Sequence, residues 1–349
     1  MRFYIDRDDG HEISGWLAPD NPNDTPVVRA VLPNGTEHLV TATFLRSDIR
    51  ELGLHNSGLV GFIVDESIIG GLSTLDGIEL YDDASDTLIY KRFRITRNQQ
   101  KRLMFYDGSV FPQRQMMARI QPFFATSYDL VERMSYDTLA NILSSPYFVS
   151  NLCTGRPLYL RYAYNLREAN YIIAALLRNP YQDLAERLLF LNLLSRSTTA
   201  PALMRYLDRY EILLPVVENL PNQDERTLRQ SMRSLSLEQR RVLANPYSRM
   251  FGCNIGEEPD FRTVSVALET LASFDIVGTR DRFSDFARLF NAFLEVPVLS
   301  PEEPPEQYNA VDDLASRLSR ITAVTQLLEH DLALYSYVEE AVENGLGQA

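Results

Sequence analysis

The stretch YIIAALLRNPYQDLAERL, residues 171–188, decides the fold that we expect for the larger part of this chain. Its first third is a continuous apolar run, which a buried strand and a buried helix can both have. The residues after this run favour a strand, because Asn179 is a good helix N-cap, Pro180 is a good first helical residue, and leucines then recur at helical spacing. The sequence therefore predicts a strand, then a helix, with Arg178 at the junction.

The same alternation continues on both sides of this stretch. Further strands are expected over residues 102–106, 146–151 and 274–279, and helices from Gln113 and over residues 129–143, 199–219, 223–245, 260–272 and 282–294. The helix over 223–245 is expected to break near Ser236, residues 245–260 are rich in turn residues, and an acidic, proline-rich loop at 300–310 precedes the C-terminal helices. Strands that alternate with helices indicate a parallel sheet.

Residues 1–96 have a different pattern. VVRAVLPNGTEHLVTATFL, residues 27–45, alternates apolar and polar positions around the turn dipeptide Asn34-Gly35. GLVGFIV, DGIEL and TLIYKRF add further short segments with turn residues between them. This pattern is typical of an antiparallel β-sandwich. We therefore expect an α/β protein with two domains, a β-sandwich over residues 1–96 and a larger domain over residues 97–349.

Composition limits the class of protein. The chain has 349 residues, of which 45% are hydrophobic and 23% charged, as in ordinary globular domains. It has no apolar run of membrane-spanning length, and its acidic start lacks the apolar segment of a secretory signal, so a cytoplasmic protein is expected.

Charge and side-chain chemistry exclude further classes. The net charge of −13 argues against a nucleic-acid partner. Lys91 and Lys101 are the two lysines, so an anion site must use arginine, backbone N–H groups or helix N-termini. Cys153 and Cys253 and the four scattered histidines fit no metal-ligand spacing, and no metal is expected.

Four stretches together resemble the sulfotransferase family, in its glycan-type and bacterial branch. AALLRNPYQDLAERL is similar to the family's strand–helix junction with the pattern LRDP, and ALETLASFDIVGTRDRFSDFARLF to its late strand between two helices. NPYSRMFG resembles the segment before that strand, and PYFVSNLCTGRP lies where the family often has a strand that ends in Gly-His. The likeness covers roughly residues 100 to 300 and implies a three-layer domain with a parallel sheet.

The resemblance implies a donor and a site. The family's sulfate donor is 3′-phosphoadenosine 5′-phosphosulfate, and the position of Arg178 is that of the arginine that binds its 3′-phosphate. Gly108 and Ser109 would form part of the cradle around the phosphosulfate, with Arg114 as a nearby cation. Arg249 would either reach the same pocket or form a salt bridge with the acidic stretch GEEPD that follows it. The acceptor would be a hydroxyl of a bacterial glycan or lipid-linked saccharide. Such an anion fits the carboxyl ends of parallel strands, where helix N-termini and N–H groups gather.

This sequence departs from the family pattern at the same places. The loop YDGSVFPQRQ lacks the family's lysine, and Glu186 falls where the family has a serine that contacts the 3′-phosphate. Asn179 replaces an aspartate, and Asn151 stands in place of a histidine. Glu132, Asp107 and Glu186 are the candidates for a base that would accept the acceptor's hydroxyl proton.

Residues 1–96 carry a second resemblance, to a small β-sandwich module attached to bacterial glycan-processing enzymes such as glycosyltransferases. It rests on Gly15-Trp16, Pro22, Gly35, Arg46-Ser47-Asp48, Gly53 and the segment GLVGF at residues 58–62. Trp16 and Phe62 are most simply core anchors, and the glycines are turn positions. The resemblance implies an accessory module.

Three functions stay open at this point. The first is sulfuryl transfer to a glycan, and the second is a catalytically inactive sulfotransferase-like protein that binds or scaffolds in glycan assembly. A glycosyltransferase is the third, although no DxD-like metal site is found beyond acidic turns such as Asp82-Asp83. A salt bridge between Arg178 and Glu186 would favour the inactive protein, and an open cleft lined by arginine would favour the enzyme. The sequence determines neither the acceptor nor the oligomeric state.

Overall fold

The computed structural model describes residues 1–92, 100–109, 113–196, 208–218, 220, 224–306 and 308–346. The chain forms two compact units. The first comprises Met1–Arg102, Phe123–Leu152 and Tyr164–Asn170, and the second comprises Leu103–Pro122, Cys153–Ala163 and Tyr171–Ala349. The predicted domain boundary at residues 96 and 97 lies outside the described residues.

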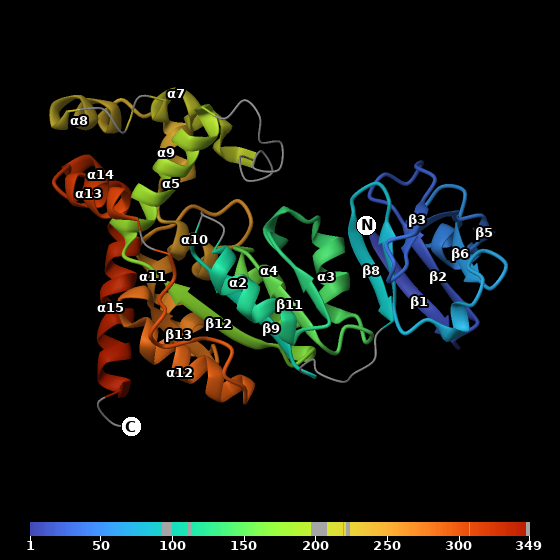
Figure 1. Ribbon diagram of the computed structural model, residues 1–349. Helices are drawn as coiled ribbons and strands as arrows, with labels where there is room; N and C mark the ends of the chain where they lie inside the picture. The colour runs from blue at the N-terminus through green and yellow to red at the C-terminus, as the bar shows by residue number, and fades with distance from the viewer. Residues whose placement is uncertain are drawn as a thin grey trace. The chain divides into compact units, whose positions relative to one another are not determined.

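Two four-stranded antiparallel sheets form most of the first unit (Figure 1). One has the order β1-β2-β6-β5, with β1 (Arg2–Asp8), β2 (Glu12–Ala18), β6 (Leu59–Asp65) and β5 (Phe44–Leu45). The other has the order β4-β3-β7-β8, with β4 (Glu37–Thr41), β3 (Val27–Val31), β7 (Ile78–Asp82) and β8 (Thr87–Arg92). Buried and less buried residues alternate along β1, β2 and β3. The antiparallel architecture predicted for this region is confirmed.

Turn residues join these strands as their chemistry predicts. Gly35 follows Asn34 with a φ of 82°, a left-handed conformation that glycine adopts at little cost, and the turn brings Val31 opposite Glu37. The helix α1 (Ser47–Glu51) and the 3₁₀ turn η1 (Leu72–Thr74) lie between strands of this region.

The first unit also contains a later segment with β10 (Thr126–Tyr128), η3 (Val131–Arg133) and α3 (Tyr136–Ser144). Ser135 caps α3 by accepting the Thr138 N–H. The helix packs on the edge strand β1, because Asn141 accepts the Phe3 N–H at 3.1 Å and Arg2 bonds to Asp137 at 2.8 Å. A helix was predicted over residues 129–143, but it begins only at Tyr136.

A five-stranded sheet has the order β10-β11-β9-β12-β13. Its other strands are β11 (Asn151–Thr154), β9 (Arg102–Asp107), β12 (Ile172–Leu177) and β13 (Ile276–Thr279). β12 pairs in parallel with both β9 and β13, so the predicted parallel sheet is confirmed for these strands. The strand predicted over residues 146–151 is wrong in position: residues 146–150 form turns and bends, and the strand begins at Asn151. Pro146 cannot donate to a ladder, which disfavours a strand there.

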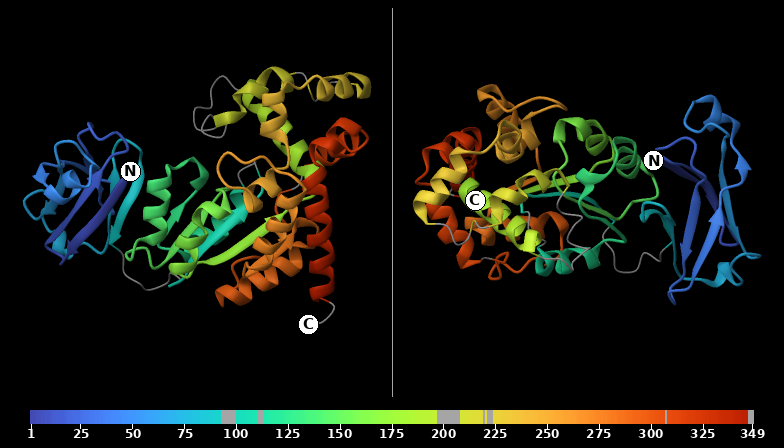
Figure 2. Two further views of the ribbon diagram at one scale, coloured as in Figure 1. Left: turned by 180° about the vertical axis from the view of Figure 1, so that it is seen from behind. Right: turned by 90° about the horizontal axis from the view of Figure 1, so that it is seen from above.

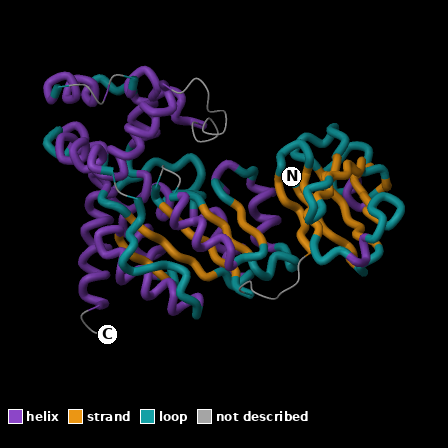
Figure 3. The backbone as a smooth tube through the Cα atoms, in the orientation of Figure 1, coloured by secondary structure: helices purple, strands orange, loops and turns teal. Residues whose placement is uncertain are grey.

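Helices surround these strands in the second unit and are coloured purple in Figure 3. They are α2 (Arg114–Ile120), α5 (Pro180–Arg196), α7 (Leu214–Val217), α8 (Glu225–Arg233), α9 (Leu237–Leu243), α10 (Pro246–Gly252), α11 (Phe261–Ala272), α12 (Phe283–Leu294), α13 (Asn309–Leu318), α14 (Thr322–Leu327) and α15 (Glu329–Leu346); α4 (Tyr159–Glu168) precedes β12. In the left view of Figure 2, the red helix α15 lies beside the orange helices, which include α11, and it packs against α11.

Several helix boundaries agree with their predicted caps. The Asn179 side chain accepts the Tyr181 N–H at 3.0 Å at the start of α5, and Ser236 forms a capping box that separates α9 from α8. Residues 199–207 of the helix predicted over 199–219 lie outside the described residues. The turn-rich prediction for residues 245–260 is wrong in its first half, where α10 begins with Pro246 as a favourable first residue.

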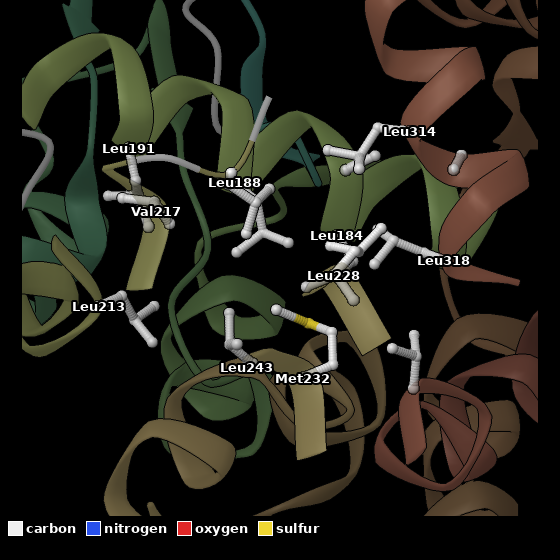
Figure 4. Close-up of a cluster of buried hydrophobic side chains, with 14 of the residues drawn as sticks. Leu184, Leu188, Leu191, Leu213, Val217, Leu228, Met232, Leu243, Leu314 and Leu318 are labelled. Atoms are coloured by element: carbon white, nitrogen blue, oxygen red, sulfur yellow. The ribbon is translucent and has the colours of Figure 1, made fainter. Parts of the chain in front are cut away.

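An extensive helical core lies on α5. Leucines of α5 pack against η4 (Asp208–Leu213), α7, α8, α9 and α13, as Figure 4 shows. Both cysteines, Cys153 and Cys253, are buried and free. Within the described ranges, no helix has both the length and the apolar character to cross a membrane.

Candidate functional site

Three neighbouring strands end side by side in the second unit. β9 and β12 are in register with Asp107 opposite Leu176, and β12 and β13 with Leu177 opposite Thr279. Because the strands are parallel, the residues that come after them emerge at the same edge of the sheet. These residues are Gly108 and Ser109 after β9, Arg178 after β12 and Arg280 after β13.

Glu186, two turns into α5, connects these strand ends. Its carboxylate forms a salt bridge with the Arg178 Nη1 and accepts the Ser109 hydroxyl. The Arg280 Nη1 lies 3.7 Å from the same carboxylate, and the Arg280 Nη2 lies 3.5 Å from the Asp107 Oδ1. We call Asp107, Ser109, Arg178, Glu186 and Arg280 the strand-end cluster.

The strand-end cluster is shielded from solvent. The side chains of Arg178, Glu186 and Arg280 are 3%, 1% and 3% exposed, and Asp107 is 14% exposed. Burial raises the pKa of Asp107, although the Arg280 guanidinium opposes that rise. Burial alone would lower the pKa of Arg280, but the nearby Asp107 and Glu186 outweigh it and raise that pKa. Arg280 is therefore held as a cation between two acidic groups.

A second buried pair lies beside the strand-end cluster on the same helix. The Arg187 Nη2 is 2.6 Å from the Asp183 Oδ2, and both side chains are almost fully buried. Burial raises the pKa of Asp183, and Arg187 opposes the rise. Together the two groups contain three guanidinium and three carboxyl groups, which sum to zero charge when all are ionised.

Tyr247, from α10, closes the cluster on one side. Its hydroxyl oxygen accepts the Arg178 backbone N–H at 3.3 Å, and its ring lies against Gly108. A Cβ at Gly108 would meet the Tyr247 hydroxyl oxygen at 2.5 Å, which real Cβ atoms do not tolerate. Gly108 therefore lets the strand-end loop approach a tyrosine ring.

Asp331, near the start of α15, fixes Tyr247 in this place. Its carboxylate accepts the backbone N–H groups of Tyr247 and Ser248 at 2.9 and 2.7 Å and the Ser248 hydroxyl at 2.7 Å. Asn245 in turn accepts the Asp331 N–H at 3.1 Å. Asp331 is completely buried, and this burial raises its pKa to about 6.

The structure places the predicted site residues in three groups. Ser109, Arg178 and Glu186 meet in the strand-end cluster, and Gly108 borders it through Tyr247. Arg114 is the exposed first residue of α2. Arg249 bonds to Glu258 at 2.6 Å and to the Glu257 carbonyl at 3.1 Å, so it pairs with the acidic loop next to it. Glu132 lies in η3 and belongs to the first compact unit.

The sequence did not single out Arg280, Tyr247 or Asp331. Arg280 could have been found, because it comes directly after β13 as Arg178 does after β12, and strand carboxyl ends meet at one edge of a parallel sheet. Tyr247 and Asp331 had no such signal. They reach the site through the packing of α10 on α15, and that packing has no local sequence pattern.

Within the described residues, no group of three histidine, cysteine, aspartate or glutamate side chains is arranged to hold a metal ion. Comparison with family models, with curated proteins and with solved structures finds no match for this chain. The chemistry at the strand ends therefore has to be inferred from their geometry.

Proposed function

We propose that this chain is a sulfotransferase-like protein that lacks sulfuryl-transfer activity and serves as a binding or scaffold protein in glycan assembly. The observation that carries the proposal is the buried salt bridge between Arg178 and Glu186. By the resemblance, Arg178 holds the position that would bind the donor's 3′-phosphate. In this structure the Glu186 carboxylate is already bound to the Arg178 guanidinium.

The charge balance supports this proposal. A phosphosulfate donor carries several negative charges, and a buried site has to offset them with cations. The strand-end cluster has two arginines and two acidic groups, and its neighbouring pair adds one of each sign. These two groups therefore leave no net positive charge for the donor unless Glu186 is displaced, and we derive no reaction step through it.

The position of Tyr247 supports the same conclusion. Two of the groups that a phosphate could approach at these strand ends are the backbone N–H of Arg178 and the surface of Gly108. The Tyr247 ring lies against Gly108, and its hydroxyl takes the Arg178 N–H. The Tyr247 side chain therefore occupies the space next to both groups.

Calorimetry with 3′-phosphoadenosine 5′-phosphate on the intact chain tests the proposal. We expect no binding by the natural chain and measurable binding by Glu186→Ser, which removes the competing carboxylate and restores the family's residue. Glu269→Ser, on the exposed side of α11, is the matched control and should not bind. Tight binding by the natural chain that Arg178→Ala abolishes would instead establish a donor site.

A second candidate is a sulfuryl transferase that uses 3′-phosphoadenosine 5′-phosphosulfate and a glycan or lipid-linked saccharide acceptor. One observation favours it: the Arg280 Nε and Nη1 atoms are buried and have no hydrogen-bond partner among the described residues. Unsatisfied guanidinium donors at a sheet edge are suited to an anion. In this candidate Gly108 and Ser109 would line the donor site beside Arg178 and Arg280. The same titration separates the two candidates.

A further inference from the structure

Aromatic side chains form one row across the sheet β1-β2-β6-β5 of the first unit. Tyr4 on β1 is directly opposite Trp16 on β2, Trp16 is opposite Gly61 on β6, and Gly61 is opposite Phe44 on β5. Directly opposed residues of antiparallel strands lie on the same face of a sheet. With strands about 4.8 Å apart, the row spans roughly 14 Å.

This row lies on the solvent face of the sheet. The neighbours of Tyr4 along β1, Phe3 and Ile5, are 3% and 1% exposed and form the core, whereas Tyr4 is 44% exposed and Phe44 is 52% exposed. A Cβ at Gly61 would meet the Phe44 Cβ at 2.9 Å, so Phe44 lies directly over this position in the row. Aromatic rings of this size are normally buried, so their alignment on an exposed face requires an explanation.

Charged side chains are held in fixed positions in the middle of the row. The Arg46 guanidinium lies over the Trp16 ring, 5.8 Å from its centre, and bonds to Asp48 at 2.8 Å and to Asp6 at 2.7 Å. Asp6 and Asp48 are 42% and 54% exposed. Their outer oxygen atoms are therefore accessible to a ligand, and their orientation is already set by Arg46.

A hollow of about 150 Å³ lies at one end of the same sheet. Arg2, two residues from Tyr4 on the same face of β1, lines it together with Asp20, Asp137 and Leu54. Leu54 packs against the same small cluster as Trp16. Residues two apart on a strand are about 6.7 Å apart, so the hollow adjoins the aromatic row. The surface therefore combines an apolar platform with a polar recess.

We infer that this surface, formed by Tyr4, Trp16, Phe44, the Arg46–Asp6–Asp48 group and the adjoining hollow, binds a neutral oligosaccharide. Sugars present apolar C–H faces edged by hydroxyl groups. Aromatic rings can cover the former, while carboxylates and guanidinium groups bond to the latter. The inference concerns the first compact unit and does not depend on whether the strand-end cluster binds a donor.

The chemistry of the surface argues against other occupants. Protein interfaces are depleted of charge at their centres, but Arg46 and two aspartates occupy the centre of this row. An acidic ligand is disfavoured, because the two arginines, Arg2 and Arg46, are outnumbered by the aspartates of the row and the hollow. Nucleic acid is disfavoured for the same reason and by the net charge of −13.

Fluorescence offers a direct test, because Trp16 is the single tryptophan of the chain. The intact protein is titrated with neutral hexasaccharides of glucose, mannose, galactose and xylose at up to millimolar concentrations, and with hexagalacturonate as an acidic probe. We expect a saturable change in Trp16 emission with at least one neutral hexasaccharide and none with hexagalacturonate. Binding of the responding neutral hexasaccharide and of hexagalacturonate to the intact protein is then measured by calorimetry.

Matched variants locate the binding. Tyr4→Ala and Phe44→Ala should each weaken binding by about tenfold or more, as for the truncation of a central aromatic contact. The controls are Tyr164→Ala and Phe261→Ala, which remove tyrosine and phenylalanine side chains that are 74% and 72% exposed elsewhere. They should leave the dissociation constant unchanged, and circular dichroism of all four variants confirms that they fold.

Three results would overturn the inference. The first is the absence of any response to all neutral hexasaccharides by both fluorescence and calorimetry. The second is saturable binding that the two row variants and the two controls affect equally. The third is concentration-dependent dimerisation in sedimentation that Phe44→Ala abolishes while no sugar binds, which would assign the surface to a second copy of the chain.

Discussion

Two groups of arginine and carboxylate side chains have similar chemistry and opposite surroundings. Arg46 bonds to Asp6 and Asp48 at the surface of the first unit, whereas Arg178 and Arg280 share Glu186 and Asp107 in the interior of the second. Exposed pairs gain little stability and stay open to other partners. Buried pairs are costly to break and leave no room for a ligand's charge. Exposed groups of arginine and carboxylate side chains can therefore form a binding surface, whereas buried groups of the same kind exclude a charged ligand.

The largest expected effect comes from removing one partner of the buried pair. Arg178→Met should lower the free energy of unfolding by about 3–5 kcal/mol, because the buried Glu186 carboxylate loses its direct partner and keeps only the Arg280 guanidinium, 3.7 Å away, as a counter-charge. Urea denaturation monitored by circular dichroism measures this change. If the loss were below about 1 kcal/mol, the pair would behave like a surface pair, and the contrast between the two regions would disappear.

The pH dependence of stability tests whether burial makes the Asp331 carboxyl group harder to ionise in the folded chain. Its pKa is raised from 3.8 to about 6 in the folded chain, so the folded state keeps this proton to a higher pH than the unfolded state. This group's contribution to stability is therefore full below about pH 4 and is lost as the pH rises through about 6. Relative to the natural chain, Asp331→Asn should gain roughly 2–3 kcal/mol of stability between pH 4 and 7.

Urea denaturation across this pH range measures the difference. Asp313→Asn, on the exposed side of α13, is the control, and its difference from the natural chain should not change with pH. A pH-independent difference for Asp331→Asn as well would mean that the carboxylate is no harder to ionise inside the protein than outside it.

A smaller effect is expected where Gly108 meets Tyr247. Gly108→Ala should cost about 1–3 kcal/mol, because a Cβ would come within 2.5 Å of a buried ring that cannot move away easily. Gly70→Ala is the control, since no atom lies within 4 Å of its added Cβ. Thermal unfolding of both variants gives the comparison. Equal behaviour would show that Tyr247 does not close the strand ends tightly.

The smallest effect belongs to the surface group. Arg46→Ala should change the free energy of unfolding by less than about 1 kcal/mol, because its partners stay solvated after the change. The same variant should weaken oligosaccharide binding. In the first unit, a substitution can therefore reduce binding without reducing stability. A stability loss as large as that of Arg178→Met would show that exposure does not distinguish the two groups.

Much of the fold is encoded in local sequence signals. The apolar run before Arg178, the cap at Asn179 and the break at Ser236 each predict what the structure has. Local signals fail where partners are distant. The strand expected over residues 146–151 begins only at Asn151, and α10 forms in a segment rich in turn residues because Asp331 accepts its first N–H groups.

The candidate site was predicted only in part. Arg178 and Glu186 were identified as a pair, because both lie within one short stretch of sequence. Arg280 lies about a hundred residues later and meets them only through the register of β13 with β12. The aromatic row has no local sequence signal for the same reason: Tyr4, Trp16 and Phe44 come from three strands, and only the sheet order aligns them.

The most direct test of the central claim is a double-mutant cycle between Arg178 and Glu186, measured by urea denaturation with and without 3′-phosphoadenosine 5′-phosphate. The cycle uses Arg178→Met, Glu186→Met and the double variant. Because the two side chains are bound to each other, we predict a coupling energy of at least about 2 kcal/mol that the nucleotide does not change. A coupling energy near zero, or one that collapses when the nucleotide is added, would contradict the account.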